Sequence, residues 1–110
     1  MSEPNAALAR ATSPSYPQRA RAGRDLAACV DVPEVAVAVL RLLLDAEDTA
    51  VTRQTAEALA RVGTAAAVRL IALAFAEADD NQADWIQTGV QDALADGAPP
   101  DVAAVLDLHS

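Results

Sequence analysis

LLDAEDTAVTRQTAEALARVGTAAAVRLIALAFA, residues 43–76, is the stretch of sequence that decides the fold of this protein. Gly63 divides the stretch into two segments, and both segments have the apolar periodicity of a helix. Asp48 precedes the first segment and Thr64 precedes the second, and both residue types favour the N-cap position. The stretch therefore predicts two helices, and the short connection between them predicts that they pack antiparallel.

The helical periodicity begins at Pro17 and continues to the end of the chain. It predicts six helices, over about 17–29, 33–44, 49–62, 65–78, 82–95 and 100–108. One helix face recurs at offsets of 35 and 33 residues. The matched sets are Val51, Thr55, Ala58, Leu59 and Val62; Ile86, Val90, Ala93, Leu94 and Gly97; and Gln18, Ala22, Asp25, Leu26 and Cys29. A period of 33–35 residues with two helices in each unit is typical of an α-solenoid.

The central unit also resembles a known family. Its acidic turn, its Val51 and Arg53, and its Ala56-Glu57-Ala58-Leu59-Ala60 core before a Gly turn are similar to a HEAT repeat. The similarity is greatest to the short bacterial kind that is also found in phycobilisome-lyase-like proteins. The resemblance covers about 17–108, and it implies an all-α fold, a short right-handed α-solenoid of about three HEAT-like helical hairpins. Residues 1–15, rich in Pro and Ser, are expected to form a flexible or loosely docked tail before a repeat domain at 16–110, with Asn5 as a candidate cap of a short helix over 6–11.

Composition excludes several classes of protein. The chain has 110 residues, of which 28 are Ala and one is Cys, with one each of Phe, Trp and Tyr. Abundant Ala with few aromatic residues favours packed helices over sheets, and a single Cys excludes a disulfide framework. The apolar stretch Val35–Leu44 is too short to span a bilayer, and no signal peptide is recognisable. We therefore expect one small cytoplasmic domain with no membrane segment, cofactor or metal.

The sequence offers few residues for catalysis. His109 is the single His and lies one residue from the C-terminus, without the spacing of a catalytic triad. Cys29 takes the place of Val62 in the repeat, which predicts a buried small side chain rather than a reactive thiol. We therefore expect that the protein is not an enzyme.

Charge is distributed unevenly along the chain. Residues 1–24 carry four Arg and one acid (+3), and residues 25–76 carry four Arg and seven acids (−3). From Glu77 onward there are eight acids and no base, so this end alone equals the net charge of −8. The acidic end is either a solvated face that maintains solubility or a docking surface for a basic protein. Nucleic acid is an unfavourable partner for a chain of this charge.

Candidate partner-binding residues fall into two groups. One lies at the start of the fifth predicted helix, where acids precede and surround the only Trp, although capping is an alternative role for the acids. The other lies on the second helix of each unit, which in HEAT-like arrays usually lines the concave surface. On these helices, the alternative to partner binding is that the Arg side chains only cover apolar surface with their aliphatic stems. The candidates are Arg41, Arg69, Glu77, Asp80, Asp84, Trp85 and Asp101.

These observations predict a non-enzymatic protein–protein interaction module, a small HEAT-like scaffold or adaptor. It would use its acidic C-terminal end or its concave face. Two alternatives stay open: an immunity or antitoxin-type protein that neutralises a basic toxin, and an accessory factor related to bilin lyases. Association of copies through the open ends of the solenoid is also compatible with the sequence.

Overall fold

The regular structure of this protein is entirely helical over residues 4–108, the part of the chain that the computed structural model describes. Residues 1–3 and 109–110, and with them His109, lie outside this part. The elements are α1 (Pro4–Arg10), α2 (Tyr16–Leu26), the 3-10 helix η1 (Ala27–Cys29), α3 (Pro33–Leu43), α4 (Thr49–Val62), α5 (Ala65–Glu77), α6 (Asp80–Ala95) and the 3-10 helix η2 (Pro100–Leu108).

Local capping explains the helix boundaries in the central stretch. The Asp48 carboxylate accepts a hydrogen bond from the Ala50 N–H at 2.9 Å and so begins α4. Gly63 ends α4 in the left-handed conformation at φ 65°, which only Gly adopts without strain. The Thr64 hydroxyl then accepts from the Ala67 N–H at 3.2 Å and begins α5. These boundaries confirm the two helices that the sequence predicts here.

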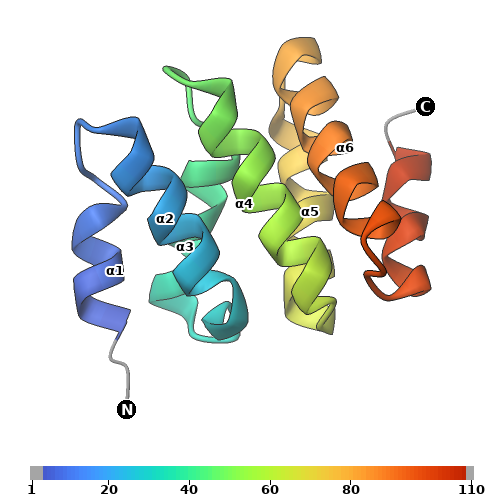
Figure 1. Cartoon of the computed structure of the whole chain (residues 1–110), viewed down its shortest axis with the longest axis horizontal. Coiled ribbons are helices and arrows are strands. Elements are labelled where there is room, and N and C mark those ends of the chain that lie inside the picture. Colours follow the sequence, from blue (N-terminus) through green and yellow to red (C-terminus); the bar gives the residue numbers. More distant parts are fainter. Residues whose placement is uncertain (1–3, 109–110) are drawn as a thin grey trace.

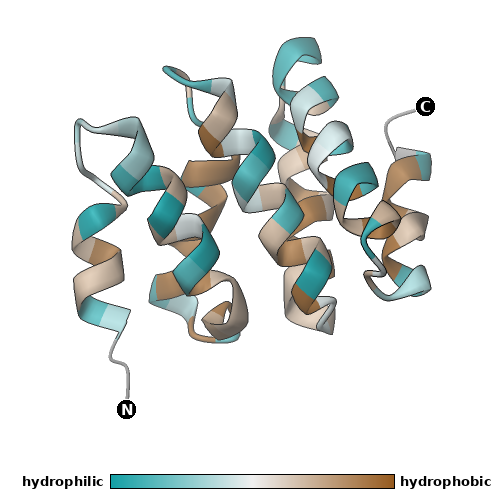
Figure 2. Ribbon diagram, viewed as in Figure 1, coloured by the Kyte–Doolittle hydropathy of each residue, from teal (hydrophilic) through white to brown (hydrophobic). Residues whose placement is uncertain are grey.

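The helices form two layers with the apolar core between them. Figure 1 shows α2, α4 and α6 side by side, with α3 and α5 behind them. The hydropathy colouring of Figure 2 shows polar residues concentrated on the front layer and apolar residues where the layers meet. The largest fully buried side chains come from every one of these helices and include Leu26, Leu43, Leu59, Ile71 and Ile86. The core is therefore one continuous cluster that extends from α1 to η2.

The front layer is held together by unusually close helix contacts. A Cβ added at Gly23 of α2 would overlap the Thr55 hydroxyl of α4, and a Cβ added at Gly89 of α6 would overlap the Arg53 carbonyl oxygen. Both positions are therefore restricted to Gly by the approach of the neighbouring helix. The close approach is what allows α2, α4 and α6 to bury small side chains such as Ala56.

The N-terminal segment contains the short helix α1, which overlaps the helix over 6–11 that Asn5 is a candidate to cap. Ala7 of this helix is buried, and Leu8 packs against the core. The side chain of Arg10 on α1 also forms an ion pair with Asp25 at 3.0 Å. With α2 and η1 counted as one unit, residues 4–108 contain seven helical units rather than six. α1 lies against α2 and α3, at the end of the array where the sequence suggests stacking of a second copy.

Two further helices differ in form from the prediction. The first predicted helix tightens into η1 at Ala27, and the last forms a 3-10 helix that begins at Pro100. None of the helices within residues 4–108 combines the length and the apolar character needed to cross a bilayer.

Candidate functional site on the face of α3 and α5

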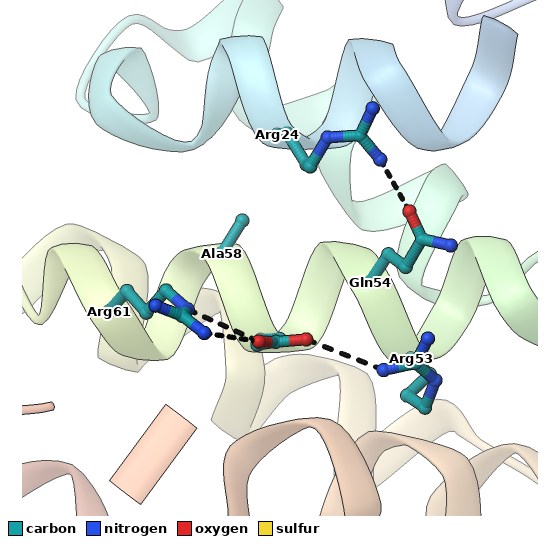
Figure 3. Close-up of a pocket in the computed structure, with 6 residues that line it drawn as sticks. Arg24, Arg53, Gln54, Ala58 and Arg61 are labelled. Atoms are coloured by element: carbon teal, nitrogen blue, oxygen red, sulfur yellow. Dashed lines mark hydrogen bonds and ion pairs between the residues drawn. The ribbon is translucent and has the colours of Figure 1, made fainter. Parts of the chain in front are cut away.

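A groove of about 470 Å³ lies on the front layer, where α2 and α4 meet. Figure 3 shows that Arg24 reaches from α2 toward α4, where its guanidinium donates a hydrogen bond to the Gln54 side-chain oxygen. The residues lining the groove are Arg24, Arg53, Gln54, Glu57, Ala58 and Arg61. Three of these six side chains end in a guanidinium group, which is the type of group that binds anions.

The ion pairs of the groove have a structural explanation. Glu57 pairs with Arg61 at 2.6 Å and with Arg53 at 3.4 Å along α4. Arg61 also pairs with Asp96, the C-cap of α6, at 2.6 Å, and Arg53 pairs with Asp92 of α6 at 3.4 Å. The hydrogen bond from Arg61 to Glu57, and to a smaller extent the one to Asp96, raises the pKa of Arg61 above its ordinary value. Three acids thus neutralise two of the arginines, and the cluster clamps α6 to α4.

This clamp is not among the features predicted from the sequence. The signal for part of it is present, since Arg53, Glu57 and Arg61 stand at i, i+4 and i+8 on one helix. The pairing across to α6 depends on how closely the two helices approach, and that distance is set by Gly89.

A buried ion pair joins α2 to the turn before α4. The Arg19 guanidinium donates to the Asp45 carboxylate at 2.8 Å, and the two side chains are only 9% and 7% exposed. Asp45 also accepts the N–H groups of Glu47 and Asp48 at 2.8 and 2.9 Å. Burial by itself raises the pKa of Asp45. The hydrogen bonds from Arg19 and from these two N–H groups outweigh burial, so the pKa lies below its ordinary 3.8. This pair maintains the fold and leaves no group free for a ligand.

Several acids of the C-terminal end are engaged within the protein. The Asp79 carboxylate caps α6 through the Gln82 N–H at 2.7 Å, and Asp92 and Asp96 belong to the clamp. The predicted binding residues Asp80 and Asp84 are exposed on the first turns of α6. Part of the acidic end is therefore already engaged in contacts that stabilise the fold.

The other predicted residues of this region are spread over three elements. Trp85 of α6 is half-buried, as expected of a side chain that covers the edge of the core. Glu77 ends α5 and Asp101 begins η2, and both are exposed. Trp85 is thus not a fully exposed anchor for a partner.

The outward face of α3 and α5 has a different character. Arg41 of α3 and Arg69 of α5 are exposed, and neither has a hydrogen-bond or ion-pair partner among residues 4–108. Val37, one turn before Arg41, is 52% exposed, and Leu73, one turn after Arg69, is 46% exposed. Four side chains on two adjacent helices thus present paired apolar and cationic groups to solvent, and we call them the α3–α5 face.

The sequence identified the two arginines of this face but not the two aliphatic residues. At the offset of 33, Val37 corresponds to Leu70, which is only 6% exposed, so the repeat predicts Val37 as a core residue. Leu73 corresponds to Leu40, which packs partly against the core. Their exposure depends on the exact rotation of α3 and α5 about their axes, and the repeat pattern does not specify that rotation.

A second hollow, of about 500 Å³, lies under α1 and is lined by Cys29, Leu26 and Ala7, with the Arg10–Asp25 ion pair at its edge. Cys29 is half-buried there rather than fully buried. Within residues 4–108 no group of three or more His, Cys, Asp or Glu side chains is placed to hold a metal ion.

Comparisons with known proteins identify no relative. No model of a protein family, no curated protein and no solved structure matches this chain.

Proposed function

We propose that this chain is a non-enzymatic protein-interaction module, a short HEAT-like solenoid that binds its partner on the α3–α5 face. Three helical hairpins support the proposed architecture: α2 with α3, α4 with α5, and α6 with η2, at the period of 33–35 residues. Stacked hairpins bury a common core and leave extended outer faces, which is the type of surface that helical-repeat proteins use for binding.

One observation carries this proposal: Arg41 and Arg69, which have no partner among residues 4–108, lie beside two exposed aliphatic side chains. The chain has 16 acids for 8 Arg, so an unpaired Arg is unexpected on its surface. The other six arginines, by contrast, each have an acceptor: Arg10, Arg19, Arg21, Arg24, Arg53 and Arg61. Arg is enriched in the core of protein interfaces, where its stem and an adjacent apolar side chain bury area together.

The acidic end is a weaker docking surface than the α3–α5 face. Asp79, Asp92 and Asp96 already bind groups of the protein itself, so a basic partner would compete with a helix cap and with the α4–α6 clamp. Within residues 4–108, no contact of this kind competes for Arg41 or Arg69.

Site-specific photo-crosslinking tests this proposal. Leu73→benzoylphenylalanine is introduced into the full chain in cells that produce it naturally, and Gln91→benzoylphenylalanine, at an exposed position on α6, is the matched control. We expect one protein adduct of defined mass from position 73 that an excess of the native chain suppresses, and none from position 91. Absence of an adduct at position 73, or the same adduct at both positions, would refute the proposed function.

A further inference from the structure

We propose that the ligand of the α3–α5 face is an acidic amphipathic helix of the partner protein, with carboxylates for Arg41 and Arg69 and apolar side chains for Val37 and Leu73. This inference rests on the proposed function, because it specifies the chemistry of the partner that binds the same face.

The register of the two helices supports this pattern. α3 and α5 are adjacent and run in the same direction, since each follows an antiparallel helix of the front layer. At the offset of 33 residues Arg69 corresponds to Ala36, next to Val37, and Leu73 corresponds to Leu40, next to Arg41. The aliphatic pair therefore occupies one diagonal of the α3–α5 face and the arginine pair occupies the other.

A helix matches these diagonals better than an extended segment. Side chains at i and i+4 lie on the same side of a helix, so an apolar stripe can follow the Val37–Leu73 diagonal while flanking positions on both sides reach the arginines. Recognition of an amphipathic helix through anchors at i, i+3, i+4 and i+7 is a common mode of peptide binding.

Charge determines the sign of the flanking residues. Among residues 4–108, no carboxylate is paired with Arg41 or Arg69, so a partner carboxylate forms a charge-assisted hydrogen bond without breaking one within this part of the chain. A basic segment would instead bring its cations to these two guanidinium groups. Glu34 and Glu77 are exposed at the N-terminal end of α3 and the C-terminal end of α5, while Arg41 lies in the last turn of α3 and Arg69 in the first half of α5. Two arginines on a chain of net charge −8 are a poor match for a polyanion such as nucleic acid.

The most acidic helix within residues 4–108 is α6, with Asp80, Asp84 and Asp92, and it does not supply such a helix from a second copy. Its apolar residues Ile86 and Val90 are fully buried in its own core, and Asp92 is held by the clamp. The helix therefore belongs to another protein.

Designed peptides test the chemistry directly. Three blocked peptides of about 18 residues, long enough to be helical, share one stripe of Leu and differ only in flanking residues, which are Glu, Gln or Lys. Binding to the full chain is measured by fluorescence anisotropy at fixed ionic strength. An NMR shift map then reports whether the amides around Val37 and Leu73 respond. A short DNA duplex serves as the polyanion control.

We expect the Glu peptide to bind about tenfold more tightly than the Gln peptide, and the Lys peptide to bind most weakly. Arg41→Gln with Arg69→Gln should abolish the advantage of the Glu peptide. The matched control is Arg21→Gln with Arg24→Gln, which removes the same charge from α2 and should preserve that advantage. Circular dichroism verifies that both variants are folded.

Equal binding of the Glu and Gln peptides, tighter binding of the Lys peptide or of DNA, or no binding of any peptide would overturn this inference. So would the same loss in both double variants. None of these outcomes affects the crosslinking result at Leu73, which separately decides whether the face binds a protein.

Discussion

Replacement of Gly23 by Ala tests how closely α2 and α4 pack. The added Cβ would overlap the Thr55 hydroxyl and would lie 3.0 Å from the Thr55 Cβ and 3.2 Å from its methyl group. Thr55 is fully buried, and its hydroxyl has no hydrogen-bond partner within residues 4–108. The added Cβ therefore clashes with a single side chain, that of Thr55, which is fully buried but can be shortened by mutation.

Two opposing terms set the size of the effect. Ala is preferred over Gly within a helix by roughly 0.5–1 kcal/mol, because Gly loses more backbone entropy on folding. Overpacking of a tight site costs about 1–3 kcal/mol. We therefore expect Gly23→Ala to lower the free energy of unfolding by about 1–2 kcal/mol, a large fraction of the stability of a domain of this size.

Thr55→Ala removes the hydroxyl and the methyl group that the new Cβ would meet. In this background only the Cβ of residue 55 remains close, at 3.0 Å from the new Cβ. Gly23→Ala should therefore cost about 1 kcal/mol less than in the native chain, and this difference is the coupling energy of the double-mutant cycle. Urea unfolding of all four proteins, followed by far-UV circular dichroism, measures each term. Stabilisation by Gly23→Ala alone, or a coupling energy below about 0.5 kcal/mol, would show that α2 and α4 are not in such close contact.

Gly89 provides the comparison. Its added Cβ would meet the Arg53 carbonyl oxygen, which belongs to the backbone of α4, as well as the Ala56 methyl group at 3.0 Å. Gly89→Ala should therefore destabilise the protein, and Ala56→Gly should not rescue it, because no side-chain change removes a carbonyl group.

Three further perturbations have defined outcomes. The pKa of Asp45 is lowered in the folded state, so the ionised carboxylate stabilises the protein above its ordinary pKa of 3.8, and this stabilisation is lost as the pH falls through the lower folded value. Asp45→Asn should therefore destabilise the protein at pH 7. In urea titrations at several pH values, the free energy of unfolding of this variant should fall less steeply with acid. Arg61→Gln should lower the stability only slightly, and this loss should shrink in about 1 M NaCl. A loss of the same size at high salt would contradict a solvent-exposed clamp. Val37→Ser with Leu73→Ser should lower the free energy of unfolding by about 1 kcal/mol or less. Ile71→Ala, at a fully buried position, should lower it by about 2–5 kcal/mol. Similar losses for the two variants in thermal unfolding would mean that the α3–α5 face is part of the core.

Local chemistry made most of the helices predictable. Asp48 and Thr64 act as N-caps and Gly63 as a C-cap through contacts within a few residues, so their effect is visible in the sequence alone. The same holds for the period of 33–35 residues, which repeats the buried stripe of one helix in the next unit. The proposed HEAT-like architecture follows from this repeat.

The helix α1 was harder to predict because its stability is not local. Seven residues between two prolines are too few to form a stable helix in isolation. Burial of Ala7 and the ion pair of Arg10 with Asp25, 15 residues away, supply the stabilisation that the segment lacks. Both contacts exist only once α2 is in place.

The sequence by itself determined that this protein is all-helical, where most helices begin and end, and that its negative charge is concentrated after Glu77. Tertiary structure decided which charges remain available, because the approach of α6 to α4 pairs Asp92 and Asp96 with arginines. It also decided which apolar residues reach solvent. Periodicity identifies the side of a helix that is buried, but the rotation and spacing of neighbouring helices determine how far that burial extends, and both depend on contacts between residues far apart in the chain.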